Sequence, residues 1–179
     1  MGNAIGMLEF TSIARGIEAS DFMVKAAQVD LIRSSTICPG KYVVIVAGNT
    51  GDVNAAMAAG EKKGEGYVVD QLLIPNIHPQ LIPAINMTVQ VDQPGAVGVL
   101  EYFSVASAIR AADIAAKAAQ VTLIEVRIGF AIGGKGYVTL TGDVGAVRAA
   151  VAAAIAQTEL LVGSAVIPKP SPTLFSALL

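Results

Sequence analysis

A single cysteine, Cys38, carries the most distinctive chemistry in this chain of 179 residues. It stands in the segment 36–41, Thr-Ile-Cys-Pro-Gly-Lys, which is typical of a tight turn between two strands. One thiol cannot hold a metal ion alone, and a single histidine, His78, excludes most histidine-based metal cages within one chain. Lone cysteines are usually small buried apolar residues. A metal site at Cys38 therefore requires several copies of the chain to meet at a symmetry axis.

Two carboxylates, Glu9 and Glu101, each end a short apolar run and are the candidates for acid–base catalysis. They occupy equivalent positions in two similar halves of the chain, and nothing in the sequence makes them converge. Catalysis is therefore the weaker interpretation of this pair.

A glycine-rich segment, residues 129–136, resembles the phosphate-binding loop Gly-x-x-x-x-Gly-Lys-Ser. Gly136 stands where that loop needs a hydroxyl group to hold Mg²⁺. The residues that follow, Tyr-Val-Thr-Leu-Thr, favour a strand, whereas a phosphate loop must open a helix whose N-terminus faces the anion. We therefore expect a hairpin loop here and no nucleotide site.

The composition excludes several classes of partner. Hydrophobic residues make up 54% of the chain and charged residues 15%, and the net charge is 12 − 14 = −2. Without a basic block the chain is a poor ligand for nucleic acid or for a membrane surface. The longest uncharged stretch, 71–91, is interrupted by three prolines, so we expect no spanning helix. We expect a cytoplasmic protein whose excess apolar surface is buried between subunits.

An internal repeat organises the chain. Residues 4–32 match residues 96–124 at 16 of 29 positions without gaps, and the match resumes after a two-residue insertion, where Gly40-Lys41 pairs with Gly134-Lys135. A period this long indicates a duplicated domain. We place the two domains at 1–88 and 93–179.

Each half reads as β-α-β-β-α-β, the ferredoxin-like layout of an α+β fold, with helices on one face of an antiparallel sheet. Ser12 is the expected N-cap of the first helix, with Ile13, Ile17, Met23 and Ala27 directed toward a core. In the first half we expect strands at 4–10, 29–36, 41–47 and 67–74, and helices at 12–27 and 50–63.

Both halves contain Gly-x-Leu-Glu, then Ala-x-Asp-x-x-x-Lys-Ala-Ala-x-Val-x-Leu, then Ile-Pro, and these motifs resemble the bacterial microcompartment shell domain. The resemblance covers essentially the whole chain, twice, and the tandem arrangement is similar to the trimeric shell proteins of that family. It implies a structural protein and not an enzyme. Three chains would form a flat pseudo-hexameric tile with a central pore, which packs edge to edge with other shell proteins in the shell of a cytoplasmic microcompartment.

The resemblance also assigns roles to residues. It implies that Cys38 of three chains binds one [4Fe–4S] cluster per trimer, for electron transfer with redox enzymes of the lumen or the cytosol. Lys25 and Lys117 would lie at tile edges. The residue after Ile-Pro is often an edge arginine in the family, whereas this chain has Asn76 and Lys169 there. The expected pore loops comprise Ile37, Cys38, Pro39, Gly40, Gly129, Phe130, Ala131, Ile132, Gly133 and Gly134.

Two other interpretations remain open at this point. A trimeric ferredoxin-like regulatory protein would bind a small molecule in a pocket between subunits and would not assemble into sheets. An enzyme would use Glu9 or Glu101 in a cleft between subunits and would lose turnover when either was changed.

Overall fold

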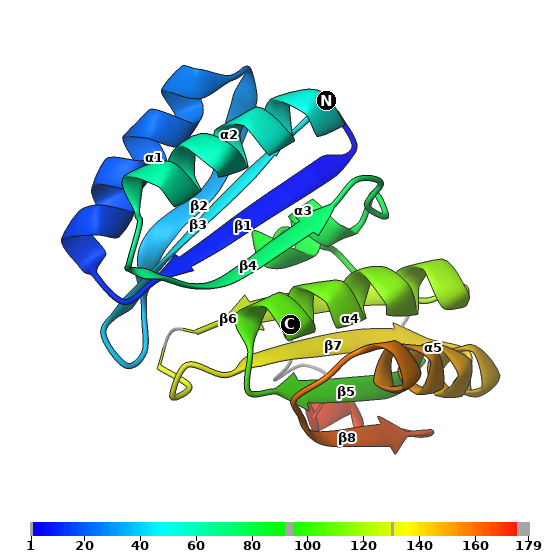
Figure 1. Cartoon of the computed structure of the whole chain (residues 1–179). Coiled ribbons are helices and arrows are strands. Elements are labelled where there is room, and N and C mark those ends of the chain that lie inside the picture. Colours follow the sequence, from blue (N-terminus) through cyan, green and yellow to red (C-terminus); the bar gives the residue numbers. More distant parts are fainter. Residues whose placement is uncertain (1, 92–94, 130, 175–179) are drawn as a thin grey trace. The chain divides into compact units, whose positions relative to one another are not determined.

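The computed structural model describes residues 2–91, 95–129 and 131–174 and divides the chain into two units, Met1–Ile77 and His78–Leu179 (Figure 1). Residues 78–88, which the sequence assigned to the first domain, therefore lie in the second unit.

The first unit is a four-stranded antiparallel sheet in the order β2-β3-β1-β4, with both of its helices on one face (Figure 1). In the central pair of strands, Ala4 is opposite Gly48 and Phe10 is opposite Tyr42. This is the predicted ferredoxin-like layout. Its elements are β1 (Ala4–Phe10), α1 (Ile13–Ala26), β2 (Val29–Ile37), β3 (Lys41–Gly48), α2 (Thr50–Lys63) and β4 (Val68–Ile74).

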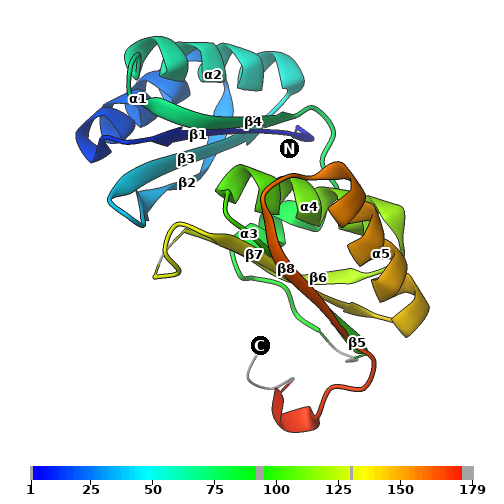
Figure 2. The ribbon, with the colours of Figure 1, turned by 60° about the horizontal axis from the view of Figure 1, so that its bottom comes forward.

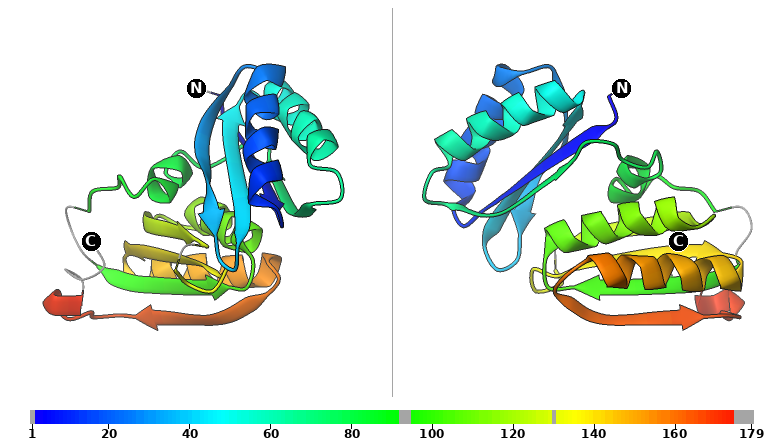
Figure 3. Two further views of the ribbon diagram at one scale, coloured as in Figure 1. Left: turned by 90° about the vertical axis from the view of Figure 1, so that its left-hand side faces the viewer. Right: turned by 45° about the vertical axis from the view of Figure 1, so that its right-hand side comes forward.

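The second unit repeats this layout, with the sheet order β6-β7-β5-β8 and its two long helices on one face (Figure 3). A short additional helix, α3 (Leu81–Ile85), precedes the repeat and packs against β6 and α4. The repeated elements are β5 (Ala96–Tyr102), α4 (Val105–Ala118), β6 (Thr122–Ile128), β7 (Gly136–Gly142), α5 (Val144–Gln157) and β8 (Leu161–Ile167).

Local sequence signals explain the bounds of these elements. The Ser12 hydroxyl accepts a hydrogen bond from the Arg15 N–H, so Ser12 is the N-cap of α1 as predicted, and Ser104 caps α4 in the same way. Proline follows β4 at Pro75 and β8 at Pro168, where it ends the strand because it cannot donate to a neighbouring strand. Among the described residues, no helix is both long and apolar enough to cross a membrane.

The core face of α1 differs from the prediction in part. Met23 is fully buried, but Ile13 and Ile17 expose 38% and 55% of their surface, so the prediction that they point into the core was wrong. The inward face of α1 is formed by small residues around Met23: Gly16, Ala19 and Ser20. A Cβ atom at position 16 would lie 2.6 Å from Tyr42, so the helix approaches the sheet closely and the isoleucines point away.

Candidate functional site

The loop between β2 and β3 presents Cys38 near its tip. Ile37 ends β2 and is buried, Cys38 is partly buried, and Pro39 and Gly40 are exposed. The Gly40 N–H donates to the Ile37 carbonyl at 3.1 Å, which closes a tight turn, and Gly40 has a φ of 86°, a conformation that favours glycine. The predicted turn thus places a free thiol where another molecule can reach it.

A lysine at the base of this loop pairs with a buried carboxylate. Lys41 Nζ donates to Glu9 Oε1, and Glu9 exposes only 3% of its side chain. In the second unit, Lys135 Nζ lies 2.8 Å from Glu101 Oε1, although Glu101 is more exposed, at 39%. Each glutamate is therefore neutralised by a lysine of its own unit, and the ion pair joins the loop to the strand at the sheet's centre.

Sequence reasoning gave Lys41 and Lys135 no role. The signal was present, because Gly-Lys recurs at the matching point of both halves. Glu9 and Glu101 were instead weighed as a catalytic pair. In the structure they lie in separate units, each bonded to its own lysine.

The matching loop of the second unit, between β6 and β7, contains no thiol. Its glycines serve the backbone conformation of the loop, because Gly129, Gly133 and Gly134 all have positive φ values. Ala131 also has a positive φ value. The Gly129 N–H donates to the Lys135 carbonyl, and the Lys135 N–H donates to the Ile132 carbonyl. Because Gly136 begins a strand, the expectation of a hairpin loop instead of a phosphate loop is confirmed. Phe130, also assigned to this loop, lies outside the described residues.

The helix lysines Lys25 and Lys117 both form the i,i+4 ion pairs that their spacing predicts, but in different surroundings. Lys25 pairs with Asp21 on an open surface, where the two side chains expose 71% and 52%. Lys117 pairs with Asp113, whose side chain is only 5% exposed. Asp113 also accepts a hydrogen bond of 2.7 Å from the backbone N–H of His78. The Lys117–Asp113 pair therefore contributes to the packing of its own unit, whereas the Lys25–Asp21 pair is accessible to a neighbouring molecule.

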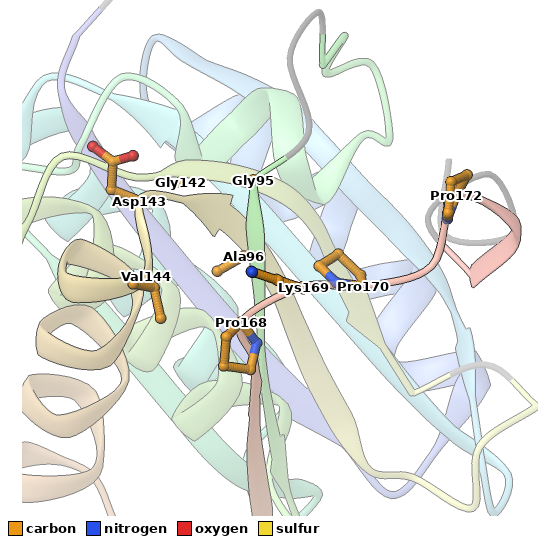
Figure 4. Close-up of a pocket in the computed structure, with 9 residues that line it drawn as sticks. All are labelled: Gly95, Ala96, Gly142, Asp143, Val144, Pro168, Lys169, Pro170 and Pro172. Atoms are coloured by element: carbon orange, nitrogen blue, oxygen red, sulfur yellow. The ribbon is translucent and has the colours of Figure 1, made fainter.

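The two residues that follow Ile-Pro lie in different units. The Asn76 side-chain oxygen accepts a hydrogen bond from Asn3 at 2.7 Å. Lys169 is exposed and borders an open hollow of about 440 Å³ at the N-terminal end of α5 (Figure 4). Asp143 and Lys169 are the charged residues of its lining, which is completed by Gly95, Ala96, Gly142, Val144, Pro168, Pro170 and Pro172.

A polar cluster on β6 and β7 was not predicted. The Tyr137 hydroxyl donates to Glu125 Oε2 at 3.0 Å, and the Arg127 side chain donates to Glu125 Oε1. Burial, and then the negative charge of Glu125, raise the pKa of Tyr137 above its ordinary value. Each oxygen of this buried carboxylate therefore has a hydrogen-bond donor, and the three side chains join the neighbouring strands β6 and β7.

Within the described residues of one chain, no three His, Cys, Asp or Glu side chains are close enough together to bind a metal ion.

Comparison with known proteins identifies the repeated unit. The BMC domain, the domain of bacterial microcompartment shell proteins, matches residues 4–77 and again residues 96–170. The chain belongs to this family. It is 46% identical to the bacterial microcompartment shell protein PduT of Citrobacter freundii over 178 residues, which are 98% of this chain and 97% of that protein.

Other relatives support the same assignment. A crystal structure of a microcompartment protein from Desulfitobacterium hafniense superposes with a TM-score of 0.94 at 46% identity and covers 98% of this chain and 99% of that one. A carboxysome shell protein, CsoS1 of Parasynechococcus marenigrum, is 42% identical over 90 residues, which are 48% of this chain and 86% of the relative. The short relative therefore corresponds to half of this chain, as expected for two tandem BMC domains.

The two BMC domains differ in the loop between their second and third strands. The cysteine occurs in the loop of the first, and the glycine-rich loop replaces it in the second. Residues 78–95, between the two matches, include α3. The named relatives are shell proteins, which fits a structural role for a BMC chain.

Proposed function

We propose that three copies of the chain form a pseudo-hexameric tile of a microcompartment shell, with the loops 37–40 and 129–134 around a central pore. The support is the tandem pair of BMC domains and the similarity to PduT over nearly the whole chain. Two similar domains per chain give six positions in a ring of three copies. The apolar side chains Ile17, Phe22 and Leu31, each about half-exposed on the first unit, supply surface for contacts between copies.

In this tile, Cys38 of each chain binds one shared [4Fe–4S] cluster on the three-fold axis. The observation that carries the proposal is the partly buried, unpaired thiol near the tip of the β2–β3 loop, present once per chain. A cubane cluster has a three-fold axis, so three equivalent thiolates match three of its irons. When bound, such a cluster supplies one-electron transfer, which here would pass electrons between the two sides of the shell.

The surroundings of the thiol fit this donor set. Cys38 is the single cysteine of the chain. The matching loop of the second unit is rich in glycine and contains no thiol that could compete for iron. Alternating loops reduce six-fold symmetry to the three-fold symmetry that the cluster requires. The ion pair between Lys41 and Glu9 holds the base of the cysteine loop.

The first test is the mass of the native particle. Sedimentation equilibrium is expected to give three times the chain mass of 18.3 kDa. A stable monomer at micromolar concentration would rule out the tile.

The second test is anaerobic reconstitution with iron and sulfide. The wild-type protein is expected to gain broad visible absorbance and one cluster per trimer, whereas the Cys38→Ala and Cys38→Ser proteins still form trimers but stay colourless. Equal cluster content in the Cys38→Ala protein, or one cluster per chain, would overturn the assignment of Cys38 and leave the tile standing.

A further inference from the structure

The outer edge of β6 is covered by the segment that enters the second unit. The Gln80 side chain donates through Nε2 to the Val121 carbonyl at 3.3 Å and accepts through Oε1 from the Leu123 N–H at 2.8 Å. The Gln80 side-chain amide thus makes the two kinds of hydrogen bond, one donated and one accepted, that the backbone of an added strand would make at this edge. Because exposed sheet edges favour pairing with other chains, this contact protects the sheet.

The same segment is fixed to α4. The His78 N–H donates to Asp113, and in α3 the side chains of Leu81, Ala84 and Ile85 are at most 1% exposed. We call residues 78–85 the internal clasp, since they hold β6 and α4 of the unit together.

The sequence of the clasp recurs after β8. Aligning Ile74-Pro75 with Ile167-Pro168 places Leu81 over Leu174, and we call the matching sequence segment, residues 171–179, the terminal clasp. Of this segment the structure describes 171–174, a helical turn beyond the end of β8 in which Ser171 Oγ accepts from the Leu174 N–H (Figure 2). Further matches are Pro79 with Pro172, Ala84 with Ala177 and Ile85 with Leu178.

The described part of the terminal clasp, residues 171–174, does not occupy the equivalent place in its own unit. β8 and β6 are at opposite edges of the sheet, and the β6 edge is already taken by the internal clasp. Leu174 accordingly exposes 39% of its surface, whereas its counterpart Leu81 is fully buried.

In the first unit, no segment among the described residues covers the matching edge in this way. β2 corresponds to β6 and is also an edge strand. Leu31 exposes 46% of its surface, whereas its counterpart Leu123 is fully buried beneath the internal clasp. Asp21 exposes 52% of its side chain and its counterpart Asp113 only 5%. Both positions that the internal clasp covers in the second unit are therefore open in the first.

We propose that the terminal clasp of one chain covers the β2 edge and the Asp21 region of another copy, as the internal clasp covers β6 and Asp113. The Ser171 N–H takes the place of the His78 N–H, and the Thr173 hydroxyl, both a donor and an acceptor, takes the place of the Gln80 amide. The contact is head-to-tail, and contacts of this kind form a ring when the rotation between copies closes, as it does in the three-fold tile proposed above. This inference deepens the proposed trimer and rests on it.

Cross-linking in the full-length protein tests the contact. In a Cys38→Ala background, which leaves no native cysteine, the pair Leu31→Cys and Thr173→Cys is treated with a short bismaleimide. We expect covalent products of two and three chains on a denaturing gel. The matched control, Thr122→Cys with Gln80→Cys, uses two partly exposed positions of the internal contact and should give a link within one chain only.

Co-expression of two singly substituted chains tests whether the β2 edge is covered by the terminal clasp of another copy or of the same chain. When one chain carries only Leu31→Cys and the other only Thr173→Cys, a two-chain product is expected, because each link must join different copies. A doubly substituted protein that links only within single chains would overturn the proposal, since the clasp would then fold back on its own chain. The absence of any link would also overturn it.

Truncation distinguishes failure of the clasp from failure of the tile. A chain ending at Pro170 is expected to dissociate at a concentration at least tenfold higher than the full chain. A truncated protein with unchanged trimer stability would refute the clasp while the tile stands, whereas a monomeric full-length protein would refute the tile itself.

Discussion

At the scale of single residues, the two units use the same ion pair under different conditions. Glu9 is buried and Glu101 is partly exposed, yet both are bonded to the lysine that ends the neighbouring loop. A buried carboxylate that loses its counter-charge keeps its desolvation penalty, whereas an exposed one regains water. The pair therefore matters most beneath the cysteine loop.

Substitution of Lys41 by Met should lower the free energy of unfolding by about 2 kcal/mol, because it leaves Glu9 buried and unpaired. The matched change Lys135→Met should cost less than about 1 kcal/mol. Urea unfolding at one fixed protein concentration measures both, and adding Glu9→Gln to Lys41→Met should recover most of the loss. Equal losses in the two single variants would contradict this role of Lys41.

Tyr137 provides a prediction about pH. Its pKa is raised, chiefly by burial, above the ordinary value of 10.0. Below that value the phenol is protonated in both the folded and the unfolded protein. Above it, the unfolded chain loses the proton first, so the stability contributed by Tyr137 declines as pH rises toward the folded-state pKa. The stability difference between the wild type and Tyr137→Phe should therefore shrink above about pH 10.

The near-ultraviolet absorbance of tyrosinate checks the same group directly. Of the four tyrosines, Tyr137 should ionise later than a free phenol, and Tyr137→Phe should remove a late-titrating component. If the Tyr137→Phe protein instead lacks only the component that ionises earliest in the wild type, the burial argument is contradicted.

At the scale of elements, strands and turns were easier to predict than helix faces. Cys38-Pro39-Gly40 indicates a turn locally, and the strands on either side of it follow. The inner face of α1 was misassigned because its buried residues are small, and hydrophobic periodicity then identifies the bulky side chains, Ile13 and Ile17, that face outward. Contacts between distant residues, such as Lys41 with Glu9, depend on strand register, which no local pattern contains.

The close approach of α1 to β3 yields a prediction. Gly16→Ala should destabilise the protein by about 1–3 kcal/mol, because the added methyl group would lie 2.6 Å from the Tyr42 side chain. Gly51→Ala, at a helical position where a methyl group meets nothing within 4 Å, should instead stabilise by about 0.5 kcal/mol. Denaturant unfolding compares the two. A neutral Gly16→Ala protein would mean that Tyr42 moves aside freely.

At the scale of the whole molecule, assembly depends on side chains that do little within one chain. Lys25 meets this description, because its pair with Asp21 is open to solvent. Lys117 does not, since it also neutralises the buried Asp113. The sequence resemblance implies that both lysines are edge residues. A substitution at Lys25 can test this without disturbing a buried ion pair, whereas a substitution at Lys117 cannot.

The family resemblance implies that Lys25 lies at the tile edge, so reversal of its charge should leave the trimer intact and abolish extended two-dimensional sheets in electron micrographs. Its long apolar stem can pack across such an edge while the ammonium group reaches a neighbour. The control is Lys62→Glu, an exposed lysine in the last turn of α2. Sheets that persist in the Lys25→Glu protein would place Lys25 elsewhere on the tile.

The internal clasp is covalently continuous with β4, which ends only a few residues before it at Ile74. The link between consecutive domains of one chain is therefore intramolecular, and tethering of this kind holds the two ends together at an effective concentration on the order of millimolar. The proposed link through the terminal clasp would instead form between separate chains that meet by diffusion. In the proposed ring, fusing two domains into one chain would thus make every second contact between domains independent of protein concentration. On dilution, a tile built in this way would separate into whole chains and never into single domains.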